Sequence, residues 1–266
     1  MADAAGGVKR TTLEIAGAEL ELNEIGSGAS VLFLHGGQGP VPGLPFFASL
    51  AKSAGRRIIM PSHPGFGGSS LPDWLDCCDD IAHIYLELMD KLSIPHAAVI
   101  GASIGGWIAA EMATKAPERF SHLVLIAPVG IKTGPVDKLD IPDLFATPPE
   151  KLQAMLFHAP DKFRADPTKM SDEQLLAAVR AREALALLAW EPYMHNPKLI
   201  HRLHRISSPT LMLRGASDGI VSATYAAAYA RLIPKARLET IPATGHVPHV
   251  ESPDATAVLI RGFLQA

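Results

Sequence analysis

Three side chains at widely separated positions have the types that nucleophilic catalysis requires: Ser103, Asp218 and His246. A serine hydroxyl becomes a useful nucleophile only when a base takes its proton and a third group orients that base. Each of the three stands in a glycine-containing segment that directly follows a predicted strand. If the fold brings them together, the chemistry they support is acyl transfer through the serine.

The serine lies at the centre of the pentapeptide Gly101–Gly105, which has the pattern G-x-S-x-G. Before it, Ala97–Ile100 is apolar and predicts a short buried strand. After it, apolar residues at helical spacing predict a helix. A sharp strand-to-helix turn strains the serine backbone and crowds its neighbours, which explains glycine two residues to either side. The hydroxyl would then be exposed beside a helix N-terminus, where free N–H groups favour an oxyanion.

The candidate acid and base also follow predicted strands. Asp218 comes after the apolar run Leu211–Leu213, and His246 comes after the run Leu238–Ile241. Because parallel sheets carry their sites at the carboxyl ends of the strands, we expect both residues to face the serine turn. Asp218 would hold the imidazole, and His246 would act as the general base.

Bulk composition excludes several classes of protein. The chain has 266 residues and a net charge of −3, from 24 Lys and Arg against 27 Asp and Glu, with no basic run. It is long enough for one large core, and nucleic acid is not an expected partner. No apolar stretch has the length of a signal peptide or a membrane span. The adjacent cysteines Cys77 and Cys78 suit a reducing compartment. We expect a cytoplasmic monomer or homodimer that acts on a small molecule, without a membrane partner.

Strand and helix patterns alternate along most of the chain. An N-terminal hairpin over residues 11–25 and six further strand runs predict an α/β fold: a mostly parallel eight-stranded sheet flanked by helices. Between residues 129 and 206 the strand runs stop, prolines become frequent, and Ser171 and Gln174 have capping-box spacing. We therefore expect a core of residues 1–128 and 207–266, with a helical cap, residues 129–206, inserted after the sixth strand.

Five motifs together resemble the α/β-hydrolase superfamily over nearly the whole chain. They are His35-Gly36-Gly37, Gly65-Phe66-Gly67-Gly68-Ser69, Gly101–Gly106, Gly215-Ala216-Ser217-Asp218 and Gly245-His246. The order Ser103, Asp218, His246 is also the order of that fold. The resemblance implies an oxyanion hole made by the main-chain N–H groups of Gly37 and Ile104, and an acyl-enzyme mechanism. His35 is expected to shape the oxyanion loop.

The serine nucleophile favours cleavage of a small to medium apolar carboxylic ester. C–C hydrolysis of the meta-cleavage-product type uses the same triad and stays open as an alternative, with Arg180 or Arg182 binding a substrate carboxylate. Two residues depart from that group, which commonly has asparagine before the nucleophile and tryptophan after the histidine, where this chain has Ala102 and Val247. For either arginine, a surface salt bridge is the commoner role. A non-catalytic small-molecule receptor on the same fold is the alternative of another class.

The cap is expected to cover the pocket and to select the substrate. Aromatic and apolar residues in and beside it are candidates for lining that pocket. The substrate-binding candidates are Phe157, Trp190, Tyr193 and Val247. The histidines of the insertion lack carboxylates at metal-ligand spacing, so no metal is expected, and the predicted mechanism requires no cofactor.

Overall fold

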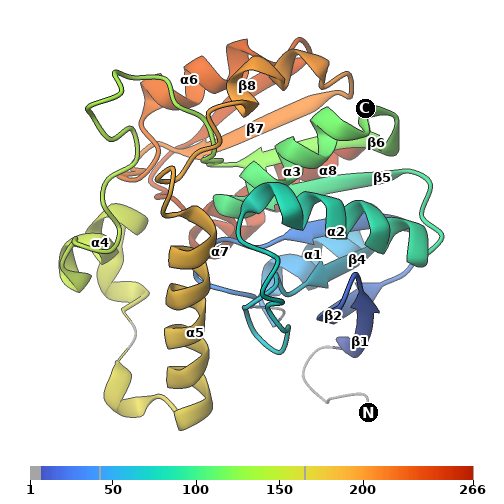
Figure 1. The fold of residues 1–266 in the computed structure, drawn as a ribbon, viewed down its shortest axis with the longest axis horizontal. Coiled ribbons are helices and arrows are strands. Elements are labelled where there is room, and N and C mark those ends of the chain that lie inside the picture. Colours follow the sequence, from blue (N-terminus) through green and yellow to red (C-terminus); the bar gives the residue numbers. More distant parts are fainter. Residues whose placement is uncertain (1–6, 42, 165, 266) are drawn as a thin grey trace.

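The computed structural model describes residues 7–41, 43–164 and 166–265, which form an eight-stranded sheet with helices on both faces (Figure 1). The strand order is β1-β2-β4-β3-β5-β6-β7-β8. The pairs β1–β2 and β2–β4 are antiparallel, and all the others are parallel. The strands are β1 (Lys9–Ile15), β2 (Ala18–Gly26), β3 (Ala29–Leu34), β4 (Arg56–Pro61), β5 (Ala97–Ala102), β6 (Phe120–Ile126), β7 (Thr210–Gly215) and β8 (Ala236–Ile241). The predicted α/β fold with a mostly parallel sheet is confirmed.

Burial explains why the central strands are largely apolar. Every residue of β5 and β7 is buried, because helices cover both faces of the sheet there. One face packs on α2 (Cys78–Lys91), α3 (Ile104–Lys115) and α6 (Ala223–Arg231). The other packs on α1 (Pro45–Ala54) and α8 (Pro253–Leu264). The short helix α7 (Pro248–Glu251) directly follows the histidine loop.

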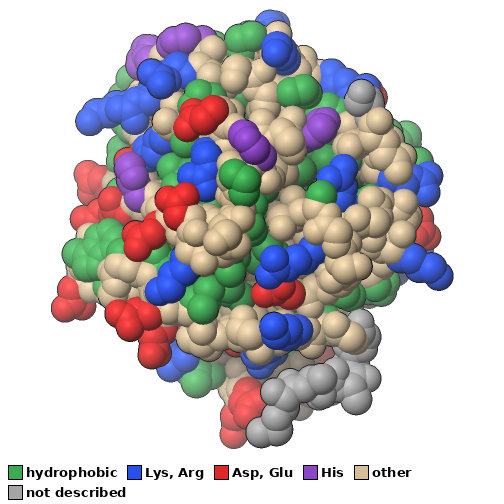
Figure 2. All heavy atoms as spheres, turned by 90° about the vertical axis from the view of Figure 1, so that its right-hand side faces the viewer, with side chains coloured by type: hydrophobic (Ala, Val, Ile, Leu, Met, Phe, Trp, Pro, Cys, Tyr) green, Lys and Arg blue, Asp and Glu red, His purple; other side chains and the backbone are tan. Residues whose placement is uncertain are grey.

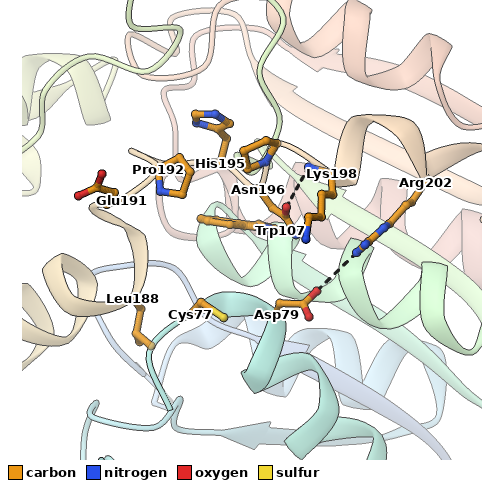
Figure 3. A pocket seen from close by; sticks show the side chains of 11 residues that line it. Cys77, Asp79, Trp107, Leu188, Glu191, Pro192, His195, Asn196, Lys198 and Arg202 are labelled. Carbon is orange, nitrogen blue, oxygen red and sulfur yellow. Dashed lines mark hydrogen bonds and ion pairs between the residues drawn. The ribbon is translucent and has the colours of Figure 1, made fainter. Parts of the chain in front are cut away.

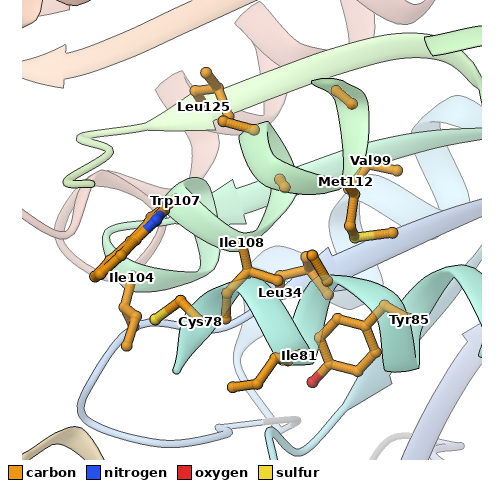
Figure 4. Close-up of a cluster of buried hydrophobic side chains, with 14 of the residues drawn as sticks. Leu34, Cys78, Ile81, Tyr85, Val99, Ile104, Trp107, Ile108, Met112 and Leu125 are labelled. Carbon is orange, nitrogen blue, oxygen red and sulfur yellow. The ribbon is translucent and has the colours of Figure 1, made fainter. Parts of the chain in front are cut away.

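Helix α3, which begins at the serine turn, is buried almost all round. Its apolar side chains pack against Ile81 and Tyr85 of α2 on one side and against Leu34 and Val99 of the sheet on the other (Figure 4). Eleven of its twelve residues are buried. A helix enclosed in this way keeps its first turn fixed, because any shift would open voids in a close-packed core.

Between β6 and β7 the chain forms the helices α4 (Pro149–Leu156) and α5 (Asp172–Ala189), on the left in Figure 1. Short 3₁₀ turns precede or connect elements at residues 117–119, 160–162, 167–169, 199–201 and 203–205. The predicted capping box is present at the start of α5: the Ser171 hydroxyl accepts from the Gln174 N–H, and the Gln174 side chain accepts from the Ser171 N–H. We refer to residues 129–206 as the insertion; its limits as a separate cap stay a prediction.

On the face seen from the right of Figure 1, acidic, basic and apolar side chains are interspersed rather than gathered in large areas (Figure 2). No helix among the described residues is both long enough and apolar enough to cross a bilayer.

Candidate active site

Ser103 occupies a strained turn between β5 and α3. Its φ of 53° and ψ of −115° lie outside the regions that L-residues favour. A Cβ on Gly101 would stand 2.3 Å from the carbonyl oxygen of Gly105, and one on Gly105 would stand 2.2 Å from that of Leu34. The glycines of the G-x-S-x-G pattern are therefore needed because backbone passes directly over them, as the sequence pattern predicts.

The structure brings the three candidate catalytic residues into one hydrogen-bonded chain. His246 Nε2 lies 3.0 Å from Ser103 Oγ, and His246 Nδ1 lies 3.0 Å from Asp218 Oδ2. Asp218 and His246 are buried. Because a carboxylate only accepts, Nδ1 donates to Asp218 and Nε2 is left to accept the serine proton.

Asp218 is itself held by main-chain donors. Its Oδ1 accepts from the N–H groups of Ile220 and Val221, at 2.8 and 2.9 Å. These bonds fix the carboxylate plane, so that both oxygens face the imidazole. The arrangement can hold the histidine in one tautomer and can stabilise its charged form.

The two candidate oxyanion donors come from two segments next to the serine. Ile104 is the first residue of α3, so its N–H has no acceptor within the helix. Gly37 belongs to the loop after β3, and this loop touches the serine, since a Cβ on Gly36 would lie 3.5 Å from Ser103 Cβ. Binding of an oxyanion at these two groups stays a prediction.

A buried pair of histidines supports the Gly37 loop. The main-chain N–H of His63 donates to His35 Nε2 at 2.9 Å, so the His35 proton is on Nδ1 and is donated to the Gly36 carbonyl. In return, His63 Nε2 donates to the His35 carbonyl at 2.8 Å and its Nδ1 accepts from Tyr85 at 2.5 Å. Burial lowers the pKa of His35 to about 4, and burial together with His35 lowers that of His63 well below its usual range. Both rings are neutral supports.

Phe157 and Val247 lie beside His246. Val247 follows His246 directly and is buried. A Cβ on Gly245 would come within 2.7 Å of Phe157 Cα, and the Phe157 ring stacks on Phe163 with centroids 4.7 Å apart. Their contact with a substrate stays a prediction.

Trp190 and Tyr193 form an aromatic cluster with Phe145. The Tyr193 hydroxyl donates to the Pro142 carbonyl, and Trp190 is 52% exposed while its ring packs against both other aromatics. The cluster braces the insertion, and its part in substrate binding stays a prediction.

Arg182 has a different role from the expected salt bridge. Its guanidinium donates to the Phe145 carbonyl at 2.9 Å and lies over the Phe145 ring, 5.2 Å from the centroid. Among the described residues, neither Arg180 nor Arg182 pairs with a carboxylate.

The inner face of α5 covers the glycine loops. The small side chains of Ala181 and Ala184 let the helix approach Gly39 and Gly65, and Leu185 lies over Gly37. Sequence reasoning missed Leu185. Its spacing of four residues from Ala181 would have placed both on one face of the helix.

A pocket of about 350 Å³ opens between the start of α2, helix α3 and the end of the insertion (Figure 3). Trp107, four residues after Ser103, forms part of its wall, and Asp79 and Arg202 face each other in it at 4.0 Å. The other lining residues are Cys77, Leu188, Glu191, Pro192, His195, Asn196, Pro197 and Lys198. Ser103, Asp218 and His246 do not line this pocket, so it is separate from the hydrogen-bonded site.

The cysteines are poor candidates for a nucleophile. Burial raises the pKa of Cys77 to about 11 and that of Cys78 well above its usual range, so both are thiols at neutral pH. Among the described residues, one group of potential metal ligands lies close together, Asp76, Cys77 and Asp80. A protonated thiol is a weak ligand, so the donor set gives little reason to expect an ion there.

Known proteins resemble this chain over most of its length. A model of the alpha/beta hydrolase family matches residues 31–259. The chain is 26% identical over 268 residues to a 2-hydroxymuconate semialdehyde hydrolase of Pseudomonas putida, covering 94% of this chain and 92% of that protein.

Solved structures share the fold. A meta-cleavage product hydrolase from Pseudomonas fluorescens IP01 has a TM-score of 0.76 at 19% identity, covering 96% of this chain and 97% of that one. An esterase from Thermogutta terrifontis has a TM-score of 0.75 at 23% identity, covering 97% and 98%. The structural neighbours thus include both an esterase and a meta-cleavage product hydrolase.

Proposed function

The chain belongs to the alpha/beta hydrolase family, and we propose that within this family it is a serine hydrolase that cleaves a small to medium apolar carboxylic ester. The observation that carries the proposal is the chain of contacts from Ser103 Oγ to His246 Nε2, at 3.0 Å, and from His246 Nδ1 to Asp218 Oδ2, at 3.0 Å. Nucleophile, base and orienting acid are thus within direct hydrogen-bonding reach of one another.

The reaction proceeds in two halves. His246 takes the Ser103 proton as Oγ bonds to the substrate carbonyl carbon, and Asp218 stabilises the imidazolium that forms. The carbonyl π electrons move to oxygen, and the N–H groups of Gly37 and Ile104 hold this oxyanion. Collapse of the tetrahedral intermediate expels the alcohol, which takes the proton from His246. Water, deprotonated by His246, then attacks the acyl-serine and releases the acid and the free enzyme.

The charge around the site supports a neutral substrate. A substrate carboxylate buried near Ser103 would need a cation close by. Arg182 is exposed and already donates to the Phe145 carbonyl. The buried Arg214 donates to the carbonyls of Val221 and Asp218, at 3.0 and 3.3 Å, so it serves the acid loop.

Cleavage of a C–C bond is the second candidate. It is favoured by the likeness to the 2-hydroxymuconate semialdehyde hydrolase, which extends over 92% of that protein. The same serine, histidine and aspartate would serve this reaction. In either case the insertion would act as the cap that selects the substrate, because α5 covers the Gly37 loop and the end of α4 meets the histidine loop.

Two substrates distinguish the candidates. We expect kcat/KM for p-nitrophenyl butanoate to exceed that for a vinylogous 1,5-diketone acid by more than tenfold. Ser103→Ala should lower kcat on the ester by ~10⁵-fold or more. Ser207→Ala, at an exposed loop position, is the matched control and should retain full activity. Preference for the diketone acid would favour the second candidate, and ester turnover that survives Ser103→Ala would contradict both.

A further inference from the structure

The last turn of α4 is hydrogen-bonded to both the acid loop and the base loop. The carbonyl of Met155 accepts from the N–H of Gly219, at 2.9 Å, and the carbonyl of Leu156 accepts from the N–H of His246, at 2.7 Å. The last carbonyls of a helix receive no hydrogen bond from within the helix, so they can accept from donors outside it. The insertion thereby contacts the main chain of the catalytic histidine directly.

One carboxylate joins the insertion to the other side of the same histidine. Glu251 is the last residue of α7, five positions after His246. Its Oε2 accepts from the N–H of Gly245, at 2.6 Å, and from that of His158, at 3.0 Å. Its Oε1 accepts from the N–H of Ala159, at 2.8 Å. A single side chain therefore ties Gly245, the residue before the base, to His158 and Ala159, the second and third residues after the end of α4.

The backbones that Glu251 joins are already in close contact. A Cβ on Gly245 would stand 2.3 Å from the Leu156 carbonyl oxygen, so no other residue fits there without displacing the insertion. Beside this contact, the His158 ring bonds to the hydroxyl of Ser217, the residue before Asp218, at 2.8 Å. The insertion and the two catalytic loops thus meet over residues 155–159.

We propose that Glu251 is a positioning residue of the active site: its carboxylate holds residues 158–159 of the insertion and the His246 loop in one fixed arrangement, which keeps the imidazole on Ser103. The proposal rests on the serine-hydrolase function proposed above. Glu251 acts on the reaction through the main chain on both sides of His246 and does not touch the reacting atoms.

Glu251→Gln is the sharpest variant because it preserves shape while removing one acceptor. All three partners of the carboxylate are N–H donors. Whichever way the amide is turned, its NH₂ faces at least one main-chain N–H, and that hydrogen bond is lost. Glu251→Asp keeps both acceptor oxygens on a shorter side chain. Asp254→Asn, at an exposed position in the first turn of α8, removes an equal charge three residues away and is the matched control.

The test compares the wild type with these three variants on p-nitrophenyl butanoate. A small displacement of a catalytic group is costly, so we expect kcat of Glu251→Gln to fall by ~10-fold or more, with KM changed less than twofold. Glu251→Asp should lose less kcat than Glu251→Gln. Asp254→Asn should keep the kcat of the wild type. By NMR, the low-field proton of the His246–Asp218 hydrogen bond should shift or broaden in Glu251→Gln only. Amide exchange should accelerate at residues 155–159 and 244–246 and not elsewhere.

Wild-type kcat and an unchanged low-field proton in Glu251→Gln would overturn the proposal, as would an equal loss in Asp254→Asn. If Glu251→Gln fails to fold, Glu251→Asp decides: full wild-type kcat with wild-type exchange at residues 155–159 contradicts the positioning role. A wild-type protein without esterase activity would instead contradict the proposed function. The exchange and NMR measurements would still report on Glu251.

Discussion

The side chain of Leu185 on α5 lies directly over Gly37. A Cβ on Gly37 would meet Leu185 Cδ2 at 2.9 Å and Cδ1 at 3.2 Å. Since the Gly37 N–H is a proposed oxyanion donor, the leucine fills space next to the position that a substrate carbonyl would take. Leu185 is therefore a candidate for limiting the size of the acyl group, and it stands on the insertion rather than on the core.

Shortening Leu185 should widen the range of acyl groups. Leu185→Ala removes three carbons above Gly37, so we expect the ratio of kcat/KM for p-nitrophenyl hexanoate to that for the acetate to rise by ~10-fold, the order of effect that a methylene or more makes in an apolar pocket. Leu187→Ala, two residues on and 58% exposed, should leave the ratio unchanged. Equal ratios in the two variants would show that Leu185 does not bound the acyl site.

Asp218→Asn should inactivate the enzyme without unfolding it. The amide oxygen would stay with the Ile220 and Val221 N–H groups, which need an acceptor, and the NH₂ would turn to His246 Nδ1. Nδ1 would then have to accept, which puts the proton on Nε2 and prevents that nitrogen from taking the serine proton. We expect kcat to fall by ~10⁴-fold, with an unfolding midpoint in urea close to that of the wild type. Retention of more than a tenth of kcat would contradict the proposed role of Asp218.

The neutral histidines should make the fold sensitive to acid. Burial lowers the pKa of His35 and of His249 to about 4, whereas in the unfolded chain these residues titrate near 6.5. The unfolded state therefore binds more protons as the pH falls from about 6.5 to 4. As the pH falls through that window, protonation of each histidine in the unfolded chain lowers the free energy of unfolding. The loss is about 3 kcal/mol for His35 alone. The stability that these two histidines contribute is fully present above pH 6.5 and is lost as the pH falls toward 4.

Urea unfolding at pH 7, 5.5 and 4.5 checks this expectation. The free energy of unfolding should fall steadily across the series, and His83→Gln, which removes an exposed histidine from α2, should follow the wild type. A free energy of unfolding that stays constant between pH 7 and 4.5 would mean that His35 does not remain neutral in the folded state.

Gly105 should tolerate no side chain. A Cβ there would stand 2.2 Å from the carbonyl oxygen of Leu34 and 2.5 Å from that of His35, and both obstacles are backbone. We expect Gly105→Ala to cost more than ~4 kcal/mol of unfolding free energy. Gly262→Ala in α8, where a Cβ meets nothing within 4 Å, should instead stabilise the protein by ~0.5–1 kcal/mol. Thermal unfolding of the two variants measures both effects, and similar midpoints would refute the steric account of the turn.

The elements that carry the triad could be predicted because their signals are local. Predicted strands precede Ser103, Asp218 and His246, and each is followed by a glycine-containing loop. The expected sheet is confirmed, and the structure brings the three side chains within hydrogen-bonding distance. Backbone passes close to Gly101 and Gly105, which explains why both are glycine. The five-residue pattern therefore predicts the turn better than either glycine alone would.

The contacts of the insertion could not be predicted, for a physical reason. Helix α5 carries apolar residues on its outer face as well, so its periodicity does not distinguish the side that covers Gly37. The exposed apolar residues of that helix are Leu175, Leu176, Val179 and Leu187. Glu251 has no sequence signature either, because it binds main-chain N–H groups, which every residue except proline supplies.

The most direct test of the account is the site of reaction with a fluorophosphonate. This probe transfers its phosphonyl group to a serine that a base activates, with loss of fluoride. Peptide mapping by mass spectrometry should find one adduct per chain, on Ser103, and none in Ser103→Ala. His246→Ala should react at least ~10²-fold more slowly. An unlabelled wild-type chain, or an adduct on any residue other than Ser103, would contradict the claim that Ser103 is the nucleophile.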